Sequence, residues 1–178
     1  MQAVVGHLMA HHAFMITEHL SHLDTLDEAI ERMGTQIAQC LQEEQTAIDL
    51  LDTLPGVSRN AAEILLAEIG PTLDRFPDAE QLAAWAGICP GNAESGGKRL
   101  NGKTRKGNVW LRQVLIEIAH VASKTKATYL AAQYRRIAAR RGKKRALVGI
   151  AHRVLKIVYE VLKNGTVYEE RLRPEETV

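Results

Sequence analysis

The segment from residue 86 to residue 108 places one serine, Ser95, among glycines and cations. A serine hydroxyl is a poor nucleophile until a neighbour removes its proton or stabilises its alkoxide. Lysine and arginine side chains would stabilise that alkoxide and would also hold the phosphate that it attacks. These residue types therefore point to phosphoryl transfer, although a serine in such a segment is also a common turn former. The cations that follow Ser95 here are Lys98, Arg99, Lys103, Arg105 and Lys106.

The same segment matches neither of two common catalytic motifs. GxSxG, the nucleophile elbow of esterases, and GxxxxGK[ST], the phosphate loop of nucleotide-binding proteins, are both absent. Potential metal ligands are also poorly spaced. His7 and His11 would share a helical face without a third ligand, and Cys40 and Cys89 have neither zinc nor disulfide spacing. We therefore predict no metal site and no cofactor in this chain.

The charge of the chain reverses at the serine. Residues 1–95 contain 3 Lys/Arg and 15 Asp/Glu, whereas residues 96–163 contain 18 Lys/Arg and 2 Asp/Glu. A segment that cannot neutralise itself favours a polyanionic partner, most commonly nucleic acid, although a solvated basic surface is the alternative. We expect the aromatic side chains on apolar faces, so contact with the backbone of nucleic acid is predicted rather than stacking on bases. These aromatic residues are Trp110, Tyr129, Tyr134 and Tyr159.

A second candidate phosphate contact lies in the sequence LDTLPGVSRN, residues 51–60. The Leu-Pro-Gly-Val stretch predicts a tight turn after a helix, and Ser58 is placed to cap the next helix, to about Ile69. This pattern is typical of a helix-hairpin-helix motif, in which backbone N–H groups at the turn bind a phosphate without reading sequence. Gly56 and Ser58 are the predicted contacts, and an ordinary helical corner is the alternative.

Composition and periodicity predict an all-α protein. Ser95 and the cations that follow it lie in a glycine-rich loop, about residues 88–108, that has no helical periodicity. Residues 1–50 form a helical arm, a coiled coil or a helical hairpin that would make a homo-oligomer, or else a helix packed on its own domain. Residues 51–165 form a compact domain with helices near 77–86, 109–124, 127–141 and 144–163, and residues 166–178 form an acidic tail. The apolar seam of the arm consists of Ile16, Leu20, Leu23, Ile30, Ile37, Leu41, Ile48 and Leu51.

Neither a membrane-spanning apolar run nor a signal peptide is recognisable, which favours a cytoplasmic protein without a membrane partner. Arg112, at the start of the predicted helix 109–124, has two possible roles. It is either a phosphate clamp or an internal ion-pair partner for Glu117.

The ordered motifs LPGVSRNAAEILLAEIG, AWAGICPGNAESGGK and TRKGNVWLRQVL resemble the C-terminal domain of the insertion-sequence-110 family of transposases, which includes the pilin-gene invertases. The resemblance extends from about Leu54 to Glu170, and the arm is similar to the coiled-coil linker of the family. The chain departs from the usual residues of this family at two places. Cys89 stands where Thr or Val is commoner, and Lys126-Ala127-Thr128 stands where Asn-Pro is expected.

This resemblance implies DNA transposition and site-specific recombination, with Ser95 forming a covalent link to a DNA phosphate. It also implies DNA and a structured guide RNA as partners, with Mg²⁺ bound by a RuvC-like acidic domain that precedes the linker in family members. No such domain is recognisable in this sequence, so we expect nucleic-acid binding without complete recombination by this chain alone. A non-catalytic DNA- or RNA-binding module, or an interaction protein whose arm matters most, are the alternatives.

Overall fold

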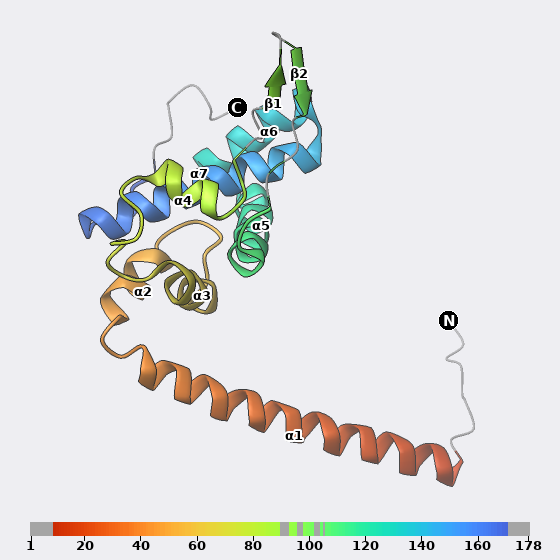
Figure 1. Cartoon of the computed structure of the whole chain (residues 1–178). Helices are drawn as coiled ribbons and strands as arrows, with labels where there is room; N and C mark the ends of the chain where they lie inside the picture. The colour runs from red at the N-terminus through yellow and green to blue at the C-terminus, as the bar shows by residue number, and fades with distance from the viewer. Residues whose placement is uncertain (1–8, 90–92, 96–97, 102–103, 105, 171–178) are drawn as a thin grey trace. The chain divides into compact units, whose positions relative to one another are not determined.

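A computed structural model describes residues 9–89, 93–95, 98–101, 104 and 106–170 of the chain (Figure 1). The chain divides into two compact units, Met1–Glu43 and Glu44–Val178. Within the described residues, no helix is both long enough and apolar enough to cross a membrane.

The first unit contains one helix, α1 (Ala10–Cys40), 31 residues long, with no buried side chain. The predicted helical arm is thus present, although its helix stops at Cys40 and not near residue 50. Its seam residues remain exposed to solvent within the chain, from 47% for Ile16 to 62% for Ile30.

The second unit begins earlier than predicted because the next helix, α2 (Gln45–Asp52), belongs to its core. Ile48 and Leu51, which the sequence pattern assigned to the arm, are 1% and 0% exposed. The helices that follow are α3 (Arg59–Ile69), α4 (Ala79–Trp85), α5 (Val109–Lys124), α6 (Tyr129–Arg141) and α7 (Lys143–Asn164).

The longest helix of this unit, α7, is the one around which the others pack. It contacts α2, α4, α5 and α6, and its buried face includes Ile150, Val154, Leu155 and Val158. Its Tyr159 hydroxyl lies 3.1 Å from the carbonyl oxygen of Phe76 and 2.8 Å from that of Pro77, which ties the connection before α4 to the core. Most of the core side chains come from helices, and connecting residues such as Leu73 and Phe76 complete it.

Side-chain caps mark several of the helix starts, including the one at Ser58 that the sequence predicts. The side chains of Ser58, Asp78 and Asn108 accept hydrogen bonds from backbone N–H groups in the first turns of α3, α4 and α5. Each cap satisfies an N–H group that has no partner within its helix. The predicted all-α fold is confirmed, with one addition, a short hairpin of strands β1 (Ala93–Ser95) and β2 (Lys98–Asn101) between α4 and α5.

The turn between α2 and α3 requires glycine at position 56. Gly56 has a φ of +89°, which side-chain-bearing residues rarely adopt, and its Cα faces the backbone of α5. A Cβ at this position would lie 2.8 Å from both the Ile118 carbonyl oxygen and the Ala122 nitrogen. Gly56 therefore lets the α2–α3 turn pack directly against α5.

We expect Gly56→Ala to lower the free energy of unfolding by on the order of 2–4 kcal/mol, because backbone strain and overpacking act together. Gly70→Ala is the matched control, since Gly70 has a φ of +85° but no atom within 4 Å of the added Cβ. Urea denaturation of both variants would measure the difference. Equal losses of stability would mean that the approach to α5 imposes no constraint.

Candidate functional site

The segment that carries Ser95 leaves the domain and returns to it at one closed base, formed by the end of α4 and the start of α5. The Asn108 N–H donates to the Trp85 carbonyl oxygen at 3.2 Å. Next to this bond, a Cβ on Gly107 would lie only 2.3 Å from the Gly87 nitrogen. A side chain at position 107 would force the two backbones apart. The Ala-Gly and Lys-Gly-Asn motifs, twenty residues apart in sequence, thus meet at this base.

Asn108 connects the base to two helices. Its Oδ1 accepts from the Leu111 N–H at 2.9 Å, which caps α5, and its Nδ2 donates to Glu68 Oε2 on α3 at 2.6 Å. One side chain therefore fixes the base of the segment, the start of α5 and the end of α3 with respect to one another.

Ser95 is the last residue of β1, and its backbone pairs with that of Lys98 at the start of β2. Glu94 pairs with Arg99, and a bulge lies between Ala93 and Glu94. Gly96 and Gly97 connect the strands and lie outside the described residues, as do Lys103 and Arg105. The sequence predicts a non-helical segment here but not the hairpin. A Gly-Gly pair between two short strands was the available signal.

Arg112 contacts the part of the same segment that follows β2. Its Nη2 donates to Thr104 Oγ1 at 2.9 Å. Glu117, the alternative partner considered from sequence, accepts instead from Gln113 Nε2 at 3.0 Å. Arg112 thus connects α5 to the chain just beyond β2, and Lys106 is exposed beside the base.

The α2–α3 turn brings Gly56 and Ser58 to the start of α3. Ser58 Oγ accepts from the Ala61 N–H at 3.3 Å. No described residue accepts a hydrogen bond from the N–H groups of Gly56, Arg59 or Asn60. Unpaired N–H groups at a helix start suit an anion, although the contact of Gly56 with α5 is a structural reason for that glycine in its own right.

A basic cluster absent from the predicted site lies where α6 ends and α7 begins. Only Gly142, with a φ of +82°, separates the two helices. Seven Lys and Arg residues lie on the last two turns of α6 and the first turn of α7. All of them are exposed, and none forms an ion pair with a described acidic residue. We call this the α6–α7 basic turn. It consists of Arg135, Arg136, Arg140, Arg141, Lys143, Lys144 and Arg145.

Trp110 corrects one expectation, because its side chain does not lie on a buried face. It is 69% exposed in the first turn of α5, beside Val109, which is 70% exposed. Tyr159, in contrast, is 6% exposed, as its position on an apolar face predicts. An exposed indole near the base of the serine segment offers a surface on which a nucleic-acid base can stack.

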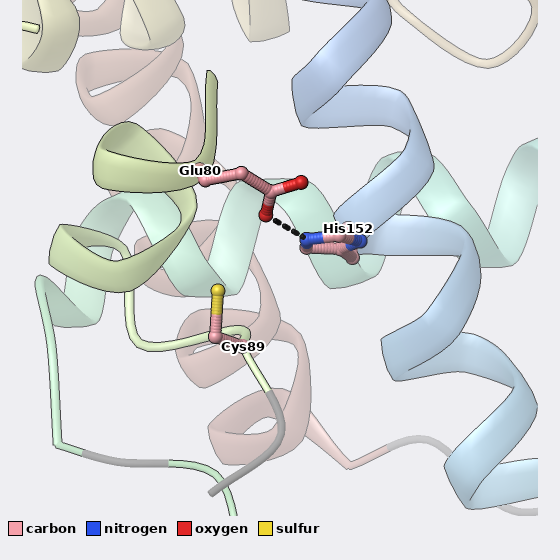
Figure 2. A group of neighbouring side chains, drawn as sticks. All are labelled: Glu80, Cys89 and His152. Carbon is pink, nitrogen blue, oxygen red and sulfur yellow. Dashed lines mark ion pairs between the residues drawn. The ribbon is translucent and has the colours of Figure 1, made fainter. Parts of the chain in front are cut away.

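One cluster of titratable side chains brings together residues that are far apart in sequence: Glu80 on α4, Cys89 after α4, and His152 on α7 (Figure 2). Lys156, also on α7, contacts Glu80. Lys156 Nζ forms an ion pair with Glu80 Oε1, and this hydrogen bond is the main reason that the pKa of Glu80 lies below its usual value. Burial lowers the pKa of His152, which favours its neutral ring. No spacing or motif in the sequence indicates this cluster.

The family model described as "Transposase IS116/IS110/IS902 family" matches residues 48–135, just under half of the chain. The chain is also 27% identical to the "Insertion element IS110 uncharacterized 43.6 kDa protein" of Streptomyces coelicolor, over 85% of this chain and 37% of that protein. Identity to the "Probable family 20 transposase" of Pseudomonas aeruginosa is 27%, over 86% of this chain and 46% of that protein.

A third relative, the "Transposase for insertion sequence element IS1328" of Yersinia enterocolitica, is 29% identical over 60% of this chain and 32% of its own length. The chain thus spans between about a third and a half of the length of these curated relatives. Both kinds of comparison relate the chain to transposases of insertion elements.

Proposed function

We propose that this chain is the serine-bearing, nucleic-acid-binding part of a DNA transposase, with Ser95 as the nucleophile. The observation that carries the proposal is the placement of Ser95 at the end of a strand, in register with Lys98, on a base that Gly107 and Asn108 hold closed. Similarity to transposases over residues 48–135 supports DNA as the substrate.

In the proposed reaction, Ser95 Oγ attacks a phosphodiester phosphorus of DNA and loses its proton. One P–O bond to the DNA breaks, the strand end leaves as a free hydroxyl, and a serine–phosphate ester joins protein and DNA. Attack of another strand's hydroxyl on this ester would release Ser95 and complete the exchange. The charge of the phosphate would be balanced by Lys98, Arg99, Lys103, Arg105 and Lys106.

The phosphate contacts that position the DNA are proposed at two places besides the serine segment. The first is the start of α3, where Gly56 and Ser58 accompany unpaired backbone N–H groups. The second is the α6–α7 basic turn. Lys143, Lys144 and Arg145 lie in the first turn of α7, where the helix dipole repels cations, so a polyanion there would relieve an unfavourable arrangement.

Arg112 is proposed as a positioning residue, because the hydrogen bond from its guanidinium to Thr104 would hold the chain that follows β2 against α5. A structured guide RNA is proposed as a second partner, since its backbone presents the same phosphates as DNA. Mg²⁺, where the full reaction uses it, is proposed to bind the RuvC-like domain of the complete transposase. The exposed seam of α1 supports a homo-oligomer formed through this helix.

We expect Ser95→Ala to abolish covalent capture of DNA and to leave DNA binding within about twofold, because only the attacking oxygen is lost. This chain would be mixed with a full-length relative whose own serine is alanine, a guide RNA and a nicked DNA target. A denaturing gel would then report a protein–DNA adduct on this chain.

The matched control for that experiment is Ser123→Ala, since the Ser123 hydroxyl on α5 donates to the His120 carbonyl oxygen of its own helix and has no other hydrogen-bond partner among the described residues. An adduct that survives Ser95→Ala would contradict the proposed nucleophile. No adduct on the unaltered chain, with mixed assembly and DNA binding verified, would favour a non-catalytic binding module.

The double variant Lys143→Gln/Lys144→Gln should change stability and binding in opposite directions. Removing two cations from the first turn of α7 should stabilise the free protein by ~0.3–1 kcal/mol per residue. It should also weaken binding to duplex DNA and reduce the slope of log affinity against log salt by about 2, through two lost phosphate contacts. Thermal unfolding and fluorescence anisotropy at several salt concentrations would measure these effects.

The control is the double variant Lys124→Gln/Lys126→Gln. It removes the same net charge, but near the C-terminus of α5, where the helix dipole favours cations. Binding that weakens equally in both double variants would show that net charge alone matters, and the α6–α7 basic turn would then have no special role.

We expect Leu23→Asp/Ile30→Asp to convert the proposed homo-oligomer into monomers, because both side chains lie in the apolar seam of α1. Thr25 and Gln36 lie on the opposite face of the same helix, so Thr25→Asp/Gln36→Asp is the charge-matched control. Sedimentation equilibrium would report the masses. A monomeric unaltered chain, or equal masses for both double variants, would reject oligomerisation through the seam.

A further inference from the structure

The cluster of Glu80, Cys89 and His152 has the composition of a metal site. It offers a carboxylate oxygen, a thiol sulfur and an imidazole nitrogen, and these three ligand atoms all lie within 4.8 Å of one another. They come from α4, from the chain just after α4, and from α7 (Figure 2). Sulfur and nitrogen ligands together favour zinc and related transition metals over Mg²⁺ or Ca²⁺.

His152 supplies a second and independent observation. Its Nε2 atom is shielded from solvent and has no hydrogen-bond partner among the described residues. Glu80 Oε2 lies 3.5 Å away, close enough for electrostatic attraction but without a hydrogen bond. A buried polar atom in this state is unfavourable, and a metal ion bound to Nε2 would satisfy it. The lone pair of a neutral imidazole is the form that binds metal.

One of the three ligand separations already matches a tetrahedral site. Zinc lies about 2.3 Å from sulfur and about 2.0–2.1 Å from nitrogen or oxygen, so the ligand atoms of a tetrahedral site are roughly 3.3–3.6 Å apart. The separation of 3.5 Å between Glu80 Oε2 and His152 Nε2 already falls in this range. The Cys89 Sγ lies within 4.8 Å of both other ligand atoms, so binding of an ion would require it to move closer to them.

Lys156 completes the arrangement as an outer partner. It pairs with Oε1 of Glu80, whereas Oε2 of the same carboxylate faces His152. A ligating carboxylate whose other oxygen is held by a hydrogen bond is a common feature of metal sites. A thiolate and a carboxylate would together neutralise a divalent ion, and the thiol proton would pass to solvent.

We propose that Glu80, Cys89 and His152 bind one zinc-class divalent transition-metal ion, with water as the fourth ligand. Cys89 lies at the start of the segment that leads to Ser95, so the ion would fasten this end of the segment to α7. The site does not depend on the proposed transposase function, because its residues and its ion would be the same in a protein that only binds nucleic acid.

Cobalt(II) titration of the full chain tests the site, because a cobalt–thiolate bond gives a charge-transfer absorption band that histidine and carboxylate ligands do not give. We expect one equivalent of Co²⁺ to produce this band together with the absorption of a tetrahedral ion, and Zn²⁺ to displace it. Histidines of α1 that bind Co²⁺ adventitiously would not contribute to the thiolate band.

Three variants distinguish the proposed site from other thiolate binding. Cys89→Ser should remove the thiolate band, and Cys40→Ser, which alters the other cysteine of the chain, should retain it. His152→Gln should weaken binding by more than the about 10–100-fold that loss of an outer partner causes. Circular dichroism of the metal-free variants would verify folding, and Zn²⁺ should raise the unfolding temperature of Cys40→Ser but not of Cys89→Ser.

The absence of a thiolate band from the unaltered chain would overturn the proposal. A band that persists in Cys89→Ser, or that disappears in Cys40→Ser, would place the thiolate in α1 and would overturn it as well. Neither result would bear on covalent capture of DNA by Ser95.

Discussion

The contact between Gly107 and Gly87 is the constraint on which the candidate active site depends. The two backbones approach so closely that a Cβ on Gly107 would lie 2.3 Å from the Gly87 nitrogen. This approach allows Asn108 to bond to Trp85, to cap α5 and to reach Glu68 on α3. A segment of about twenty residues can therefore extend from a helical core without loosening it, since both of its ends are fixed at one place.

Some cations of the second unit lie where they lower the stability of the free protein but can bind a ligand. Cations in the first turn of α7 oppose the helix dipole, and the α6–α7 basic turn has no described acidic partner. Burial of α7 offsets this cost, because its apolar face is covered by four other helices. A helix with so large a buried face can carry an unfavourable terminus, which leaves its cations available for a ligand.

Local signals in the sequence predicted most helices closely. Ser58, Asp78 and Asn108 stand at helix starts, and the predicted helix 109–124 coincides with α5. The division between the units could not be placed as well, because Ile48 continues the periodicity of the arm while packing in the core. The cluster of Glu80, Cys89 and His152 was missed because only the packing of α4 on α7 brings positions 80, 89 and 152 together.

The two glycine-dependent approaches, at Gly56 and Gly107, converge on α5. Gly56 packs the α2–α3 turn against the backbone near Ile118 and Ala122, and Gly107 sets the start of the same helix against the end of α4. Any displacement of α5 would therefore move the base of the serine segment and the α2–α3 turn together. The proposed phosphate contact at the start of α3 and the base of the segment that carries the proposed nucleophile would then keep a fixed separation, which favours reaction at one defined phosphate.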